Sequence, residues 1–367
     1  MSQGSAAQAT ESRSKVPVLE VDRLRVTFRT DDGPVPAVEE VSFQVERGQT
    51  LGIVGESGSG KTVASLAALG LHDPRTATVT ARGLRLNGRD LLQMPRAALR
   101  ALRGDRMSVI FQDPMTALNP YLRVGEQLAE VLTLHRGVSQ REALTQAALM
   151  LGQVGISSPE ARLRAYPHEL SGGMRQRVVI AMALLCGPEL VFADEPTTAL
   201  DVTIQAQVLQ LIRDQQTRTG MALVLVSHDM GVMATMADHV LVMYGGLIVE
   251  SASAVDLFTA PRHPYTVGLL GSLPRLRRRG ERLFAIAGLP PLPQERPSGC
   301  VFAPRCALAV AACRAERPAE QGVPGSPDHT VRCIRHAEVP AWAASLGLLD
   351  AAPPRAENST GSEVLHG

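Results

Sequence analysis

The feature that most constrains this chain is an eight-residue loop with the pattern G-x-x-x-x-G-K-[ST]. Its residues are Gly55, Glu56, Ser57, Gly58, Ser59, Gly60, Lys61 and Thr62. In such a loop the glycines permit a tight turn whose N–H groups surround phosphate, while the lysine reaches the outer phosphates and the hydroxyl holds Mg²⁺. An apolar run at 50–54 precedes the loop and a helix-compatible run at 62–69 follows it. The sequence therefore predicts a strand, a phosphate-binding loop and a helix.

Length and composition limit the class of protein. The 367 residues are too many for one ordinary domain core, and 45% hydrophobic with 20% charged residues is typical of a globular protein. A formal net charge of +1 gives no attraction to nucleic acid, so we expect no nucleic-acid partner. The longest apolar segment, 178–186, is about half the length that crosses a bilayer, and residues 1–15 lack the apolar core of a secretion signal. We expect a protein that stays in the cytoplasm.

The pattern of apolar residues predicts an α/β fold. Alternation in residues 19–30 and 37–45 predicts antiparallel strands separated by a turn at 31–34. Residues 91–104 and 124–151 carry leucine, alanine and charged residues without β-branched runs, which favours helices. These helices are expected to form an insertion after the phosphate loop.

Two later apolar runs, 190–193 and 222–226, each precede a helix-like segment, and this order of strand and helix predicts a parallel sheet. Proline and arginine become frequent after about residue 260, which marks a domain boundary. The expected divisions are a tail at 1–16, a nucleotide-binding domain at 17–260 with a helical subdomain at about 113–178, a C-terminal domain at 261–340 and a tail at 341–367. The basic run of Arg275, Arg277, Arg278 and Arg279 is expected to be a solvated linker.

Two adjacent carboxylates, Asp194 and Glu195, end the apolar run 190–193. Parallel sheets bind ligands at the carboxyl ends of their strands, so both side chains are expected near the phosphate loop. We expect Asp194 to help hold Mg²⁺ together with Thr62, and Glu195 to orient or deprotonate the water that attacks the γ-phosphate. Without the upstream loop, a solvated strand edge explains the pair equally well.

A second small, flexible turn precedes the helix-like run 176–185 and predicts another anion site, with a plain helix N-cap as the alternative. Residues 170–176 resemble the signature sequence of ATP-binding cassette (ABC) proteins, a family that works as dimers. The resemblance implies that ATP held by the loop of one subunit is contacted by the turn of the facing subunit. The residues assigned to this contact in trans are Ser171, Gly172, Gly173, Gln176 and, from a second loop, Asp201.

Other positions resemble functional residues of the same family. Gln112 resembles the loop glutamine that touches Mg²⁺ or the attacking water, and His228 resembles the histidine that contacts the γ-phosphate and holds the general base. Phe28 matches the position that stacks on adenine, although the family more often carries tyrosine there and a core phenylalanine is the alternative. The resemblance assigns to ATP, in cis, Phe28, Gly55, Ser57, Gly58, Ser59, Gly60, Lys61, Thr62, Val63 and Gln112. It assigns to Mg²⁺ Thr62, Gln112 and Asp194.

Residues 111–120 and 262–266, with the cysteine-bearing segment after them, resemble the ATP-binding subunits of dipeptide and oligopeptide importers, a pattern that nickel importers share. The resemblance implies an ABC-type P-loop ATPase fold: a RecA-like parallel-sheet core, an antiparallel β subdomain, a helical subdomain and a small loop-rich C-terminal appendage. It further implies ATP hydrolysis that energises peptide uptake at the cytoplasmic face of the cell membrane. The implied partners are a second ATPase subunit, identical or homologous, two transmembrane permeases and an extracytoplasmic solute-binding protein. Nickel or another small solute is the alternative cargo, and an ABC ATPase without a transport role is the alternative from another class.

Four of the five cysteines fall at C-x5-C-x6-C-x19-C, while Cys186 lies apart in the ATPase core. Four thiolates can ligate a [4Fe–4S] cluster, and the importer resemblance favours one at Cys300, Cys306, Cys313 and Cys333. Structural zinc usually has closer ligand pairs, and reduced thiols without a ligand are the third alternative. The arginines expected to offset the charge of a cluster are Arg305, Arg314, Arg317 and Arg332.

Overall fold

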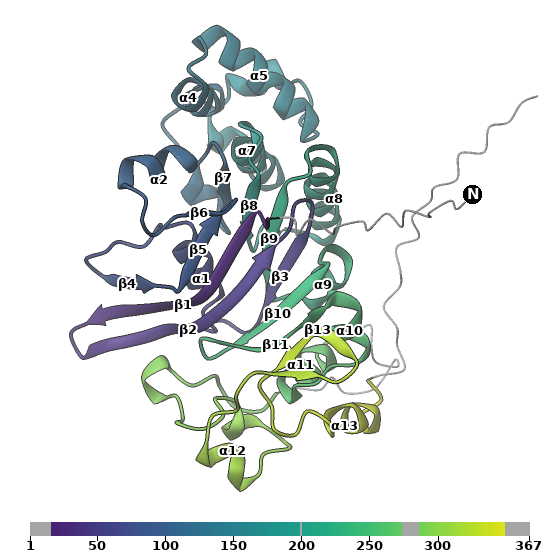
Figure 1. Ribbon diagram of the computed structural model, residues 1–367. Coiled ribbons are helices and arrows are strands. Elements are labelled where there is room, and N and C mark those ends of the chain that lie inside the picture. Colours follow the sequence, from purple (N-terminus) through teal and green to yellow (C-terminus); the bar gives the residue numbers. More distant parts are fainter. Residues whose placement is uncertain (1–15, 199, 274–285, 349–367) are drawn as a thin grey trace, which may run out of the picture.

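The computed structural model describes residues 16–198, 200–273 and 286–348 (Figure 1). The smaller of its two sheets is antiparallel and contains β1 (Leu19–Thr30), β2 (Gly33–Val45), β4 (Ala77–Thr80), β5 (Gly83–Leu86) and β6 (Arg89–Asp90). The predicted pairing of the first two strands is confirmed, but the turn between them has two residues because Thr30 lies opposite Gly33. β2, which contains Pro34, is an edge strand, and edge strands are where sheets tolerate proline.

The larger sheet contains the predicted parallel core. Its order is β12-β13-β11-β10-β3-β9-β8-β7. The parallel strands are β3 (Thr50–Val54), β7 (Met107–Ile110), β8 (Leu190–Asp194), β9 (Ala222–Ser227) and β10 (His239–Tyr244), and β11 (Leu247–Ser253) is antiparallel to β10. Every residue of β3, β8 and β9 is buried, as expected for central strands covered on both faces. The register aligns the carboxyl ends of these three strands.

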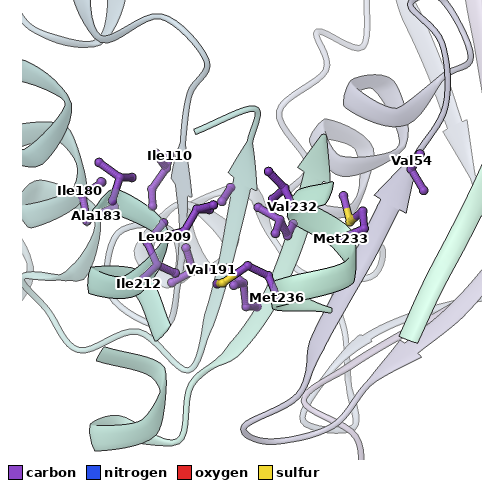
Figure 2. Packing of buried hydrophobic residues seen from close by; sticks show 14 of the residues in the cluster. Val54, Ile110, Ile180, Ala183, Val191, Leu209, Ile212, Val232, Met233 and Met236 are labelled. Carbon is purple, nitrogen blue, oxygen red and sulfur yellow. The ribbon is translucent and has the colours of Figure 1, made fainter. Parts of the chain in front are cut away.

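Alternate residues of β8 pack on opposite faces of the sheet. Val191 belongs to a buried cluster with α7 (Gly172–Leu184), α8 (Val202–Thr219) and α9 (Met230–Met236), and Figure 2 shows Leu209 and Ile212 of α8 beside it. Phe192 belongs to a second cluster, with α1 (Lys61–Ala68) and the antiparallel sheet. The two clusters hold β8 rigidly, so the carboxylates at its end are fixed in place.

The helical part is more divided than the sequence predicted. Its elements are α2 (Arg96–Leu102), α3 (Pro114–Ala117), α4 (Val124–Arg136), α5 (Gln140–Gln153) and α6 (Pro159–Leu163). The single helix expected at 124–151 is wrong, because Gly137 adopts a left-handed conformation that ends α4 and Ser139 caps α5. The helix expected at 91–104 begins only after Pro95, which is its N-cap residue. Short 3₁₀ turns lie at Pro167–Glu169, Pro293–Glu295 and Ala303–Arg305.

The C-terminal region is joined to the core sheet and lies at the opposite end of the molecule from α4 and α5 (Figure 1). Its elements are α10 (Ala254–Thr259), α11 (Pro264–Gly271), α12 (Ala311–Ala315), β12 (Gln321–Val323), β13 (Ser326–Val331) and α13 (Val339–Ser345). β13 pairs with β11, so this part of the chain extends the main sheet. The boundary expected at residue 340 falls inside α13, and Leu348 beyond it is buried.

Three expectations from the sequence lie outside the described residues: the tail at 1–15, the basic run at 275–279 and the part of the final tail from 349 onward. Within the residues described, the helices are too short or too polar to cross a bilayer.

Candidate functional site

A cavity of about 740 Å³ lies at the carboxyl ends of the central strands. It brings together most of the residues that the sequence assigned to ATP in cis and to catalysis. Those that line it are Gly55, Ser57, Gly58, Gly60, Lys61, Thr62, Val63, Gln112, Glu195 and His228. Thr198 also lines the cavity, as do Gly268, Leu269 and Ser272 of the C-terminal region, which the sequence did not single out.

The phosphate loop connects β3 to α1, as its pattern predicted. Gly55 has φ of 157°, and a Cβ atom there would lie 2.1 Å from the carbonyl oxygen of Met243. Gly60, at φ 101°, is the left-handed residue that starts α1. Other residue types would be strained at both positions, so the glycines set the path of the loop.

Lys61 folds back onto its own loop. Its Nζ donates hydrogen bonds to the carbonyl oxygens of Gly55 at 2.7 Å and Glu56 at 3.0 Å. Burial lowers the pKa of Lys61, and the nearby carboxylates Glu195 and Asp194 oppose that effect. The ammonium group is therefore a desolvated cation, which binds an anion such as phosphate more strongly than an exposed one does.

Glu195 is held by three side chains. His228 Nδ1 lies 3.0 Å from its Oε1, while Oε2 accepts hydrogen bonds from Gln112 Nε2 at 3.0 Å and Thr198 Oγ1 at 2.8 Å. Burial disfavours the charged form of Glu195, but hydrogen bonds from His228 and Thr198 outweigh it and hold its pKa below the usual range. Glu195 is thus an ionised, oriented carboxylate that faces the cavity, which is what a general base requires.

Asp194 is a buried carboxylate at the end of β8. It is 8% exposed, and its Oδ1 has no hydrogen-bond partner among the described residues. Burial raises the pKa of Asp194, and a hydrogen bond with Thr62 offsets part of that shift. Ser59 Oγ in the phosphate loop is likewise buried and unpartnered within the described chain. Oxygen atoms of these kinds are suitable for Mg²⁺ and a bound phosphate.

The residues expected to act in trans lie outside the cavity. Ser171 caps α7 by accepting a hydrogen bond from the N–H of Met174, and Asp201 caps α8 in the same way from Thr203 and Ile204. Gln176 is 1% exposed, and its Nε2 donates to the carbonyl oxygen of Pro196 at 2.7 Å. Gln176 thus joins α7 to the segment after β8.

Phe28 also lies outside the cavity, and its ring meets the edge of His72 with 5.5 Å between ring centroids. It is partly buried against the cluster of the antiparallel sheet. This packing is the environment that the alternative interpretation, a core phenylalanine, describes.

The four clustered cysteines line one small pocket of about 10 Å³, which is roughly the space that one water molecule needs. Burial raises the pKa of the Cys306 thiol to about 11 and that of Cys333 to about 12. Across the described ranges, no group of three or more His, Cys, Asp or Glu residues is arranged to hold a metal ion. The arrangement does not fit a [4Fe–4S] cluster, so that prediction is not supported.

Three of the four arginines expected to balance a cluster pair with carboxylates instead. Arg305, Arg317 and Arg332 form ion pairs with Glu56, Glu39 and Glu320 respectively. The Arg305 contact reaches the phosphate loop, where Tyr265 also touches Glu56. These two contacts with Glu56 leave no signal in the local sequence, because Tyr265 and Arg305 lie more than 200 residues away.

Comparison with known proteins agrees with this geometry. A family model described as "ABC transporter" matches residues 38–198, and another, "Oligopeptide/dipeptide transporter, C-terminal region", matches residues 249–313. The chain is 49% identical over 308 residues to the oligopeptide transport ATP-binding protein OppD of Salmonella typhimurium, covering 84% of this chain and 91% of that protein. It is 48% identical over 316 residues to the dipeptide transport ATP-binding protein DppD of Bacillus subtilis, covering 86% and 94%. The dimeric structure of MJ0796, a bacterial ABC transporter cassette, superimposes with a TM-score of 0.57 at 25% identity, over 64% of this chain and 98% of that one.

Proposed function

The chain belongs to the ABC transporter family, and we propose that it is the ATP-hydrolysing subunit of an importer that energises the uptake of dipeptides or oligopeptides. One observation supports this most directly. The ionised Glu195, held by His228, Thr198 and Gln112, faces the same cavity as Lys61 and Thr62 of the phosphate loop. A phosphate-binding loop opposite an oriented base is the arrangement that ATP hydrolysis requires.

In the proposed reaction, Lys61 exchanges its bonds to the loop carbonyls for the outer phosphates of ATP. Glu195 orients the attacking water and accepts its proton, and His228 and Thr198 keep the carboxylate aimed at that water. We propose Thr62, Gln112 and Asp194 as the residues that hold Mg²⁺, which supplies neutralisation of the phosphate charge. Phe28 is proposed to stack on adenine, which requires the ring to turn from His72 toward the nucleotide.

A second ATPase subunit completes the proposed site. Within one chain, Ser171 and Gly172 are exposed outside the cavity, so they are available to a nucleotide held elsewhere. Gln176 is buried, so its proposed contact requires its side chain to leave the hydrogen bond to Pro196. We propose that they contact the γ-phosphate bound to the loop of a facing subunit, so that ATP joins the two subunits and hydrolysis releases them. The residues proposed to act in trans are Ser171, Gly172, Gly173, Gln176 and Asp201.

The proposed assembly is a transporter at the cytoplasmic face of the cell membrane. Its further members are two transmembrane permeases, which respond to closure of the ATPase pair near Gln112, and an extracytoplasmic solute-binding protein. The names of the relatives and the match over residues 249–313 favour peptides over nickel as cargo. We keep residues 17–260 as the proposed nucleotide-binding domain, with 113–178 as its helical subdomain and 261–340 as the C-terminal domain.

The proposal is tested by reconstitution. Two permeases and a binding protein encoded beside this chain are expected to give ATP-dependent uptake of a labelled dipeptide or oligopeptide into liposomes. A Lys61→Ala chain should assemble with them and give no uptake. Uptake of nickel without peptide uptake would overturn the cargo assignment, and the absence of permease genes beside this one would support an ATPase without a transport role.

The four-cysteine pocket enters no step of this cycle. The three occupancies weighed from the sequence are separated by assaying iron, sulfide and zinc on protein purified without oxygen. Iron with sulfide would establish a cluster and zinc alone a structural zinc site. Absence of all three, with full ATPase activity retained, would establish unliganded reduced thiols.

A further inference from the structure

Glu56, the second residue of the phosphate loop, is held by two residues of the C-terminal region. Its backbone N–H donates a 2.7 Å hydrogen bond to the hydroxyl of Tyr265. Its carboxylate accepts two hydrogen bonds from Arg305, at 2.5 Å and 3.1 Å. Its carbonyl oxygen accepts the 3.0 Å hydrogen bond from Lys61. Its carbonyl oxygen also accepts a 3.2 Å hydrogen bond from the N–H of Ser59. Every polar group of Glu56 therefore has a partner, and two of the four partners, Tyr265 and Arg305, lie 209 and 249 residues further along the chain.

Arg305 is itself fixed on all sides. Its side chain is 6% exposed. Besides Glu56, it donates to the carbonyl oxygens of Ala287 at 2.9 Å and Gly288 at 3.1 Å and to the hydroxyl of Tyr244 at 3.3 Å. A guanidinium group with its planar set of donors occupied in this way has one available orientation. Arg305 thus makes a rigid bidentate contact with Glu56 of the loop.

Tyr265 is fixed by packing. It is fully buried on α11, with ring centroids 4.7 Å from Tyr244 and 5.3 Å from Phe302. Its backbone N–H donates a 3.1 Å hydrogen bond to Nδ1 of His263, the N-cap residue of α11. The same helix supplies Gly268 and Leu269 to the wall of the nucleotide cavity. The C-terminal region therefore contacts the site both through the loop and through the cavity wall.

We propose that Arg305 and Tyr265 are positioning residues of the nucleotide site, which hold Glu56 and thereby set the affinity of the loop for the phosphates of ATP. This inference rests on the proposed function, in which ATP occupies the loop. The physical reason is charge. Glu56 lines the nucleotide cavity and its carboxylate acts electrostatically on Lys61, so it opposes anion binding there unless its charge is neutralised. Arg305 neutralises it, and Tyr265 fixes the peptide from which it projects.

The charge argument predicts opposite effects for the two members of the pair. Arg305→Gln leaves a negative charge beside the phosphates, so ATP should bind about tenfold more weakly. Glu56→Gln leaves the positive charge of Arg305, so ATP should bind more tightly, by about threefold. The double variant lacks both charges and should return to within about threefold of wild type. A role confined to packing predicts instead that Glu56→Gln weakens binding and that the double variant is no better than Arg305→Gln.

Tyr265→Phe tests the hydroxyl alone. It removes the acceptor of the Glu56 N–H and keeps the aromatic packing, so ATP affinity should fall about threefold with kcat within twofold of wild type. Arg317→Gln is the matched control. It breaks another ion pair between the C-terminal region and the core, to Glu39 at 2.8 Å, without touching the loop. Its ATP affinity should equal that of wild type.

The experiment uses the full chain and measures the Kd of ATP by displacement of a fluorescent ATP analogue, together with KM, kcat and the unfolding midpoint of each variant. Wild-type affinity in Arg305→Gln, or weaker binding in Glu56→Gln, would overturn the inference. If Arg305→Gln does not fold, the direction in which Glu56→Gln changes the affinity for ATP tests the inference by itself. Lys61→Ala separates this inference from the proposed function. If Lys61→Ala binds ATP as tightly as wild type, both the proposed function and the positioning role are overturned. If Lys61→Ala loses ATP binding while Arg305→Gln binds ATP like wild type, only the positioning role is overturned.

Discussion

His228 Nδ1 lies 3.0 Å from Oε1 of Glu195, across the carboxyl ends of the adjacent strands β8 and β9. An ionised carboxylate only accepts hydrogen bonds, so Nδ1 carries the proton and donates it to this contact. Nε2 is then the imidazole nitrogen that is free to accept from water or to meet a phosphate oxygen when it is protonated. The pair fixes the tautomer of the histidine and the orientation of the base together.

Replacing Glu195 by glutamine should abolish hydrolysis while retaining ATP. The amide keeps the shape of the side chain but takes no proton from water, so we expect kcat to fall at least about 100-fold. Phosphate release measures the loss, and filter binding of labelled ATP measures the retention. Glu189→Gln is the control, since Glu189 lies just before β8 and forms an ion pair with Arg106 away from the cavity. Hydrolysis at the wild-type rate in Glu195→Gln would exclude Glu195 as the base.

Asp194→Asn should raise the Mg²⁺ concentration that ATPase activity requires. It should also stabilise the folded protein in the absence of Mg²⁺. The buried carboxylate has an unpartnered oxygen, and burial raises its pKa, so its charged form is unfavourable to the folded state. We expect the Mg²⁺ concentration for half-maximal ATPase activity to rise at least about tenfold. We also expect a higher unfolding midpoint than wild type at pH 8 in EDTA. An unchanged Mg²⁺ titration would remove Asp194 from the proposed metal ligands.

The phosphate loop and the strands beside it could be predicted because their information is local. The spacing of Gly55, Gly60 and Lys61 and the apolar runs before Asp194 are contained within short windows, and the structure has these elements where they were expected. The division of one expected helix at Gly137 also has a local cause, the left-handed conformation of that glycine. A glycine inside an otherwise helical pattern does not by itself distinguish a break from a tolerated residue.

The contacts of the C-terminal region could not be predicted in this way. The pairing of Arg305 with Glu56 and of β13 with β11 depends on chain topology, and neither partner changes the local pattern around the other. The arginines near the cysteines were expected to balance the charge of a cluster because they are near in sequence. In the folded chain three of them pair with carboxylates instead, Arg305 with Glu56 of the phosphate loop, Arg317 with Glu39 of β2 and Arg332 with Glu320.

His263 should make the stability of the protein depend on pH below neutrality. Burial lowers the pKa of His263 to about 3, against an unfolded value of about 6.5. Below pH 6.5 the unfolded chain binds a proton at His263 that the folded chain does not. The free energy of unfolding is therefore unaffected by His263 above pH 6.5 and decreases as the pH falls from 6.5 toward 3. The loss has a limiting slope of about 1.4 kcal/mol per pH unit.

His263→Asn isolates this effect, because asparagine also caps helices and can accept the hydrogen bond from the N–H of Tyr265. Between pH 7.5 and 5.0 the free energy of unfolding of wild type should fall by about 2 kcal/mol more than that of the variant. Urea denaturation at the two pH values gives the comparison. Equal losses in both proteins would show that His263 is not responsible.

Leu348→Ala tests where the folded chain ends. Leu348 lies beyond the boundary expected at residue 340, is 3% exposed and packs with Val267 of α11 and with Val339 and Ala343 of α13. Truncating a buried leucine removes its transfer free energy and leaves a cavity, so the free energy of unfolding should fall by about 2–5 kcal/mol.

The matched control for that variant is Leu289→Ala in the same region of the chain, because Leu289 is 87% exposed and its truncation should change stability by no more than about 0.5 kcal/mol. Both values come from urea denaturation of the full chain at pH 7.5. Equal stabilities for the two variants would place α13 and Leu348 outside the cooperative fold and return the end of the C-terminal domain to residue 340. If only Leu348→Ala lowers the free energy of unfolding, the C-terminal domain extends to residue 348. Its last helix, α13, is then coupled through Leu348 and Val267 to α11, the helix whose Tyr265 contacts the phosphate loop.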